Sequence, residues 1–204
     1  MASSESANDC TLVELIVAMS PSGLIAAEGI EPWVLASDIY TIQKIIDSEP
    51  VIVSRRVFEE KEELFAFSTC FVIAQESFDE NGNKRFYTDI EDAIFDAQKQ
   101  ATDKVYVLGG RWVFNQAMEF ATSIRATIVN EPMIDQNNAS YCDYLFSFDP
   151  NQWKIVKTQS YSLDIDTSAY TVVHYQRVSN VVHFPKQRKT KRANVIYLDD
   201  YRSR

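Results

Sequence analysis

The chain contains several short runs of apolar residues, rich in valine and isoleucine, that are separated by polar segments. Runs of about four to eight such residues between turn-forming residues are typical of β-strands. Strands are therefore predicted at residues 12–19, 51–53, 70–74, 105–108, 126–130, 153–160 and 170–177.

Helical periodicity appears between these runs. Four isoleucines recur at the spacing of one helix face, which predicts a helix over 36–47 with a buried stripe. Ser37 is predicted to cap this helix, because its hydroxyl can accept from a free backbone N–H. Further helices are predicted at 90–100 and 112–121, with a shorter one at 56–64. The four isoleucines are Ile39, Ile42, Ile45 and Ile46.

The order of these elements predicts the fold class. Short buried strands that alternate with helices are typical of an α/β fold with three layers, in which a mainly parallel central sheet has helices on both faces. The last two strands are joined by the polar segment 161–169, and this short connection predicts an antiparallel C-terminal hairpin at the sheet edge.

Composition supports one folded domain. The hydrophobic fraction is 46% and the aromatic fraction 12%, which excludes a wholly disordered chain. We predict a flexible N-terminus at 1–11, a domain at 12–178 and a basic tail at 179–204. No apolar run is long enough to cross a bilayer and no signal-peptide pattern begins the chain, so we expect a cytoplasmic protein with no membrane contact. We expect a monomer.

Three cysteines without paired spacing argue against a disulfide framework and against a zinc site. We therefore expect no metal and three reduced thiols, of which Cys70 is predicted to lie in a strand.

Charge is unevenly distributed. Residues 181–204 hold seven Lys/Arg and two Asp, a net charge of +5. Because the whole chain has a net charge of −9, residues 1–180 carry −14. The basic run KQRKTKR and the segment NVIYLDDYR that follows it predict a docking peptide for a protein partner or a nucleic-acid contact. A solvated tail that packs back on the acidic body is an equal alternative.

Two stretches carry candidate chemistry. In LIVAMSPSGLIAAEGIEPWVLASD, a strand enters a loop, passes Pro32 and Trp33, and opens the helix that carries Asp38 among apolar neighbours. A buried lone carboxylate must be hydrogen-bonded or shifted in pKa, although an acid at a helix start is also explained by the helix dipole alone. In VYVLGGRWVF, a strand ends in Gly109 and Gly110 and leads directly into a helix. Backbone N–H groups at such a junction can meet a phosphate.

With PVIVSRRVF between them, these stretches resemble the dihydrofolate reductase family over residues 12–178. The resemblance implies NADPH-dependent reduction of dihydrofolate or a similar pterin to the tetrahydro form, within one-carbon metabolism. It assigns the reaction to Asp38, Trp33 and Thr127, with Asp38 holding the pterin and supporting protonation of N5 while a hydride arrives at C6. The residues that it implies for substrate binding are Ile16, Ala18, Ile42 and Leu108. Those that it implies for NADPH are Ile25, Arg55, Arg56, Gly109, Gly110 and Phe114.

Several positions depart from the family's pattern. Ser54 stands where the family has glycine, and Val57 where it has a threonine that bonds around the cofactor phosphate. Ala26 replaces another glycine, and Glu31 puts a charge in the loop after the first strand. No arginine lies between Arg56 and Arg85, although the family holds the glutamate tail of folate with one. Ala74 and Gln75 replace residues that help bind the 2′-phosphate.

Three functions remain open from the sequence. The first is a divergent, active dihydrofolate reductase. The second is a non-catalytic binding or structural protein that retains the fold, and the third is a related reductase acting on another heterocycle. Arg55 and Arg56 are likewise open, because they could meet the phosphates of NADPH or pair with the acids of the following helix.

Overall fold

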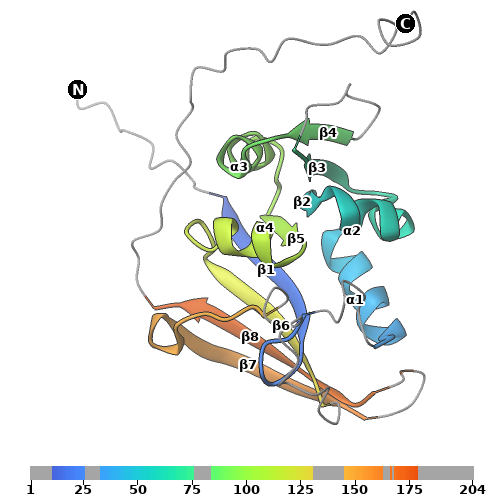
Figure 1. Cartoon of the computed structure of the whole chain (residues 1–204), viewed down its shortest axis with the longest axis vertical. Helices are drawn as coiled ribbons and strands as arrows, with labels where there is room; N and C mark the ends of the chain where they lie inside the picture. Colours follow the sequence, from blue (N-terminus) through green and yellow to red (C-terminus); the bar gives the residue numbers. More distant parts are fainter. Residues whose placement is uncertain are drawn as a thin grey trace, which may run out of the picture.

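The computed structural model describes residues 11–25, 33–75, 84–130, 145–162, 166 and 168–178. Its centre is an eight-stranded sheet in the order β4-β3-β2-β5-β1-β6-β8-β7 (Figure 1). The six strands β1 to β6 pair in parallel, whereas β8 runs antiparallel to β6 and β7 antiparallel to β8. The strands are β1 Leu12–Met19, β2 Pro50–Ser54, β3 Thr69–Ile73, β4 Lys84–Tyr87, β5 Lys104–Leu108, β6 Ser123–Val129, β7 Trp153–Tyr161 and β8 Tyr170–Arg177.

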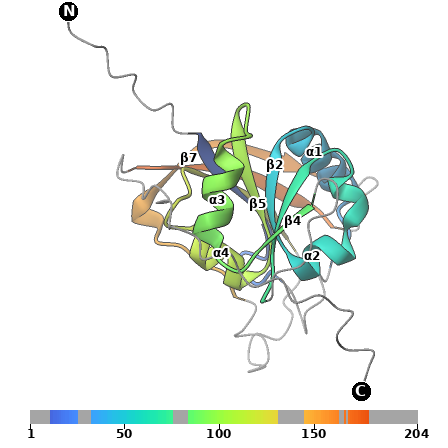
Figure 2. The ribbon, with the colours of Figure 1, turned by 90° about the horizontal axis from the view of Figure 1, so that it is seen from above.

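Helices cover both faces of the sheet, with α1 and α2 on one side and α3 and α4 on the other (Figure 2). Because both faces are covered, consecutive residues of the central strands are buried, as in Val51, Ile52 and Val53. This arrangement confirms the predicted fold class, including the antiparallel hairpin at the edge. The helical elements are α1 Ala36–Ile46, α2 Arg55–Glu60, η1 Glu62–Phe65, α3 Ile90–Gln98, α4 Arg111–Ala117 and η3 Pro150–Gln152.

Two of the hydrophobic clusters lie on opposite faces of the sheet, as the two-residue alternation of the strands requires. Leu15 and Ile52 point to the side of α3 and α4, where they pack in the core that contains Ile94. Ile16 and Val51 point to the opposite side and pack in the core that contains Ile46 of α1. Ile42 of the predicted stripe is also buried, whereas Ile39 is exposed at the start of the helix.

Strand β4 was not predicted. Its sequence, KRFY, is half-buried throughout and has no apolar run, as expected of a strand that pairs on one side only at the sheet edge. The predicted helices over 90–100 and 112–121 are shorter, and the one over 56–64 is two elements, α2 and η1. The thiol of Cys70 lies in β3 as expected, and its burial raises the pKa to about 12.

The prediction that Ser37 caps α1 was wrong. The N-cap position is Leu35, which makes no side-chain cap, and Ser37 lies inside the first turn. The N–H of Ser37 donates instead to Asp166 Oδ1 at 2.9 Å, from the segment between β7 and β8. A carboxylate distant in sequence therefore supplies the cap, which no local pattern could indicate.

The loop after β1 is tied to the segment that precedes β7. Gly23 has a φ of +88°, and an added Cβ would lie 2.3 Å from the carbonyl oxygen of Phe146. The N–H of Phe146 donates to Gly23 O at 2.8 Å, and Leu24 bridges to Leu145. A glycine is thus required here both by its conformation and by the close approach of the two segments.

No helix among the described residues is long and apolar enough to cross a membrane. The predicted features at 1–10 and in the tail at 179–204 lie outside the described residues, as do Ala26, Glu31, Cys10 and Cys142.

Candidate active site

A cavity opens at the carboxyl ends of β1 and β5, beside the first two turns of α1, with a volume of about 90 Å³. Parallel strands place their carboxyl ends at one edge, and ligand sites of open α/β sheets lie at that edge. Nine of the residues predicted from the resemblance line this cavity. They are Ile16, Ala18, Ile25, Trp33, Asp38, Ile42, Leu108, Gly109 and Phe114.

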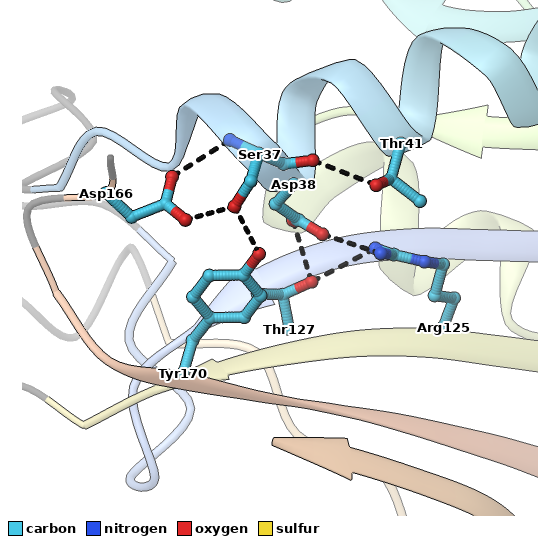
Figure 3. Close-up of polar contacts among 7 residues, drawn as sticks. All are labelled: Ser37, Asp38, Thr41, Arg125, Thr127, Asp166 and Tyr170. Carbon is cyan, nitrogen blue, oxygen red and sulfur yellow. Dashed lines mark hydrogen bonds and ion pairs between the residues drawn. The ribbon is translucent and has the colours of Figure 1, made fainter. Parts of the chain in front are cut away.

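Asp38 is the acidic group of this cavity and is 3% exposed. Its Oδ1 accepts from Nη2 of Arg125 at 2.6 Å, and its Oδ2 accepts from Oγ1 of Thr127 at 2.8 Å (Figure 3). Nη1 of Arg125 also donates to Oγ1 of Thr127 at 3.1 Å, which closes a ring of three hydrogen bonds. The carboxylate is therefore held at both oxygens and its charge is balanced inside the protein.

Arg125 was not among the predicted site residues. It lies in β6 two residues before Thr127, so the two side chains share one face of the strand. It is 3% exposed and does not line the cavity, which places the guanidinium behind the carboxylate. A single cation inside the apolar strand SIRATIV was the available signal, since a buried arginine requires an anionic partner.

His174 is the cross-strand neighbour of Arg125 on β8. Burial lowers the pKa of His174 below its ordinary value, and Arg125 reinforces this shift while Glu14 opposes it. The imidazole is therefore held in the neutral form near neutral pH, and Arg125 remains the cation that faces Asp38.

A second polar group fixes the start of α1. The hydroxyl of Ser37 bonds to the carboxylate of Asp166 and lies 2.7 Å from the hydroxyl of Tyr170 (Figure 3). Burial raises the pKa of Tyr170, so its phenol stays protonated. These contacts join α1 to β8 and to the segment that precedes it, and they hold the turn that carries Asp38.

Trp33 contributes a polar atom without a partner. Its ring is buried and lines the cavity, yet Nε1 makes no hydrogen bond within the described part of the chain. A buried donor left unpaired costs about 1 to 3 kcal/mol. The indole N–H therefore fits a ligand or water acceptor in the cavity that Asp38 shares.

A larger cavity of about 550 Å³ lies beside the start of α2, and its lining includes Ser54, Arg55, Arg56 and Trp112. Arg55 pairs with Glu59 and Arg56 with Glu60, each at 2.7 Å, and all four side chains are about half exposed. Arg55 and Arg56 thus pair with acids of their own helix and also line a cavity. Exposed pairs of this kind are weak enough for an anion to replace the acid.

The two glycines between β5 and α4 differ in their surroundings. Gly110 is the N-cap residue of α4, and an added Cβ would meet nothing within 4 Å. At Gly109 an added Cβ would lie 2.9 Å from Cβ of Val113. Open space therefore exists beside Gly110 for a ligand to approach the main chain, whereas Gly109 is required by the packing of α4. Ser54, which stands in place of a family glycine, caps α2 through Val57 N.

In the described ranges, no three His, Cys, Asp or Glu side chains gather in a group that could hold a metal ion.

Fold and site together define an α/β domain with a buried carboxylate at the carboxyl edge of its sheet. The model of the family "Dihydrofolate reductase" matches residues 12–177, and the chain belongs to this family. It is 27% identical over 127 residues to dihydrofolate reductase type 8 from Escherichia coli, a match that covers 58% of this chain and 75% of the relative. The relative of the same name from Shigella sonnei matches with the same identity and coverage.

A solved structure shows the same fold. The dihydrofolate reductase from Enterococcus faecalis, complexed with NADP(H) and RAB-propyl, superposes with a TM-score of 0.70. The two chains are 19% identical, and the match covers 82% of this chain and 97% of that one.

Proposed function

We propose that the protein reduces dihydrofolate or a closely related pterin with NADPH. The observation that carries the proposal is the joint placement of Asp38, the unpaired N–H of Trp33, and Gly109 and Phe114 around one cavity. A buried carboxylate beside an unpaired donor is suited to a flat heterocycle that presents both N–H groups and an acceptor.

The chain's own residues divide the work as follows. Asp38 accepts hydrogen bonds from the ring and amino N–H groups of the pterin, orients it, and supports protonation of N5. Thr127 holds one carboxylate oxygen in place, and Trp33 donates to an acceptor of the ring or to a water beside it. NADPH, when bound, supplies the hydride that is transferred to C6. The apolar wall of the cavity excludes water, and it is formed by Ile16, Ala18, Ile42 and Leu108.

The site fits NADPH at two places. Ile25, Phe114 and the glycine pair are proposed to contact the nicotinamide half, because Phe114 lines the cavity and the space beside Gly110 is open. Arg55 and Arg56 are proposed to meet phosphate oxygens in the larger cavity, where the guanidinium groups would exchange Glu59 and Glu60 for a doubly charged anion.

The glutamate tail of a folate carries a carboxylate that needs a cation. The arginine that supplies this cation in the family is absent from this chain. Leu64 lines the cavity within the segment that lacks an arginine, and Lys61 is the one cation among the described lining residues. We propose that Lys61 meets the carboxylate of the tail. A lysine makes a less directional contact than the bidentate contact of arginine, so a higher KM for dihydrofolate is expected.

The test is oxidation of NADPH by the purified protein in the presence of dihydrofolate, followed by the loss of nicotinamide absorbance. Asp38→Asn should lower kcat by at least about 100-fold, because the amide cannot support N5 protonation. Asp47→Asn is the matched control, since Asp47 is exposed at the opposite end of α1. Equal turnover by Asp38→Asn and wild type would rule out the assigned role.

A second function is favoured by two particular features. The volume of about 90 Å³ is below the roughly 300 Å³ of small ligand sites, so a bicyclic ring must displace part of the wall to enter. The charge of Asp38 is also balanced by Arg125. Reduction of another heterocycle, or ligand binding without reduction, would account for both. Quenching of tryptophan fluorescence by NADPH without dihydrofolate turnover would favour this alternative.

A further inference from the structure

The carboxylate that faces the cavity is already part of an ion pair. Arg125 and Asp38 are both 3% exposed, and Nη2 lies 2.6 Å from Oδ1. The guanidinium lies on the side of Asp38 away from the cavity, because Asp38 lines the cavity and Arg125 does not. A ligand at Asp38 therefore meets a negative group whose charge is balanced a few ångströms behind it.

Hydrogen-bonding capacity remains at this carboxylate. Two oxygens provide about four acceptor sites, and Arg125 and Thr127 occupy one on each oxygen. An N–H donor on a ligand can still bond to either oxygen. Only the extra attraction that a positively charged ligand would gain from an unbalanced carboxylate is lost, and the like charge of Arg125 opposes such a ligand.

We propose that Arg125 is a specificity-determining residue that removes the preference this site would otherwise have for cationic heterocycles over uncharged ones of the same shape. The inference rests on the proposed function insofar as it takes the cavity around Asp38 to be the heterocycle site. The ligand class that loses this advantage is a planar cation with adjacent N–H donors, such as a protonated 2,4-diaminopyrimidine.

A purely structural role for the pair makes a different prediction. If Arg125 only stabilises the buried Asp38, its replacement weakens the fold and changes the affinity for charged and uncharged ligands alike. If it sets specificity, its replacement changes the ratio of the two affinities. That ratio is the decisive measurement.

The probes are 5-benzyl-2,4-diaminopyrimidine, which protonates near neutral pH, and its uncharged 2-amino-4-oxo counterpart. Their dissociation constants are measured by calorimetry on the full chain, on both sides of the diaminopyrimidine's own pKa. For wild type we expect both ligands to bind and the diaminopyrimidine affinity to change by less than about threefold on protonation, because Arg125 balances Asp38.

Arg125→Gln removes the charge and keeps a donor for Asp38. It should shift the affinity ratio toward the cationic ligand by about tenfold or more, as expected for loss of a like charge at this range. Arg125→Lys retains the charge and should keep the wild-type ratio. Arg177→Gln is the matched control, because it removes an arginine of β8 that donates to the carbonyls of Ala121 and Met118.

An unchanged ratio in a folded Arg125→Gln variant would overturn the proposal. If that variant does not fold, the wild-type pH profile decides: a tenfold gain on ligand protonation overturns the proposal, and a flat profile supports it. Failure of both ligands to bind wild type also overturns it. Dihydrofolate turnover is assayed separately. If turnover is absent but the affinity ratio shifts as expected, only the proposed function is contradicted and the proposal for Arg125 stands.

Discussion

Asp38 carries a negative charge into an apolar surrounding, and the residues that make this possible are Arg125 and Thr127. Burying a carboxylate is unfavourable unless it is paired and hydrogen-bonded, and here both conditions hold at 2.6 Å and 2.8 Å. Thr127 is the shared member, because its hydroxyl donates to Asp38 and accepts from Arg125. Removing it should therefore affect two charged groups together.

Thr127→Val keeps the shape of the side chain and deletes the hydroxyl. We expect a loss of about 1 to 3 kcal/mol in the free energy of unfolding, since Asp38 and Arg125 each lose a hydrogen bond in a buried place. Denaturant titration measures this loss. Thr127→Ser restores the hydroxyl and should recover most of the stability. Stability equal to wild type in Thr127→Val would show that the hydroxyl is not part of the network.

At the scale of elements, the junction between β5 and α4 and the start of α1 decide the shape of the site. The glycine pair at the first junction has two different physical roles. Gly109 faces Val113 of the following helix, whereas Gly110 faces open space. The start of α1 is held by Asp166 rather than by a local cap, so the position of Asp38 depends on the segment between β7 and β8.

Substitution by alanine at each glycine distinguishes their two roles. Gly110→Ala should leave the unfolding midpoint unchanged, because nothing lies within 4 Å of the added Cβ, and should weaken NADPH binding if the cofactor approaches this residue. Gly109→Ala should lower stability by about 1 to 3 kcal/mol through its contact with Val113. Thermal unfolding and fluorescence titration with NADPH measure the two effects. Unchanged NADPH affinity in Gly110→Ala would place the cofactor elsewhere.

The whole molecule combines an acidic body with a basic tail. The family match ends at 177, where β8 also ends, and residues 181–204 carry a net charge of +5 beside −14 for the remainder. The tail therefore lies beyond the matched residues. We propose that the tail is a separate module that binds a partner, with a solvated tail as the alternative.

Truncation after Asn180 tests this at the level of the molecule. We expect the truncated protein to keep the unfolding midpoint of the full chain and the proposed NADPH oxidation, and to lose retention on heparin at low salt, because the removed residues carry the positive charge. Measurement of retention against salt concentration checks this. Unfolding of the truncated domain would instead show that the tail packs on the body.

The sequence by itself determined the architecture. Runs such as Val51 to Val53 are apolar at every position, and this pattern is typical of a strand covered on both faces. The charged strand β4 was not predicted. As an edge strand it pairs with one neighbouring strand only, and its sequence contains no buried apolar run. The resemblance also named Asp38, Trp33, Gly109 and Phe114, and the fold places all four around one cavity.

Only the tertiary structure decided what surrounds these residues. Asp38 and Arg125 are 87 positions apart, and Ser37 and Asp166 are 129 apart. Local patterns report propensity and periodicity within one element, whereas a buried charge is satisfied by whichever side chain the strand order brings to it. The pairing of β6 with β1 and β8 brings Arg125 behind the carboxylate, and this cation decides how the site responds to charge.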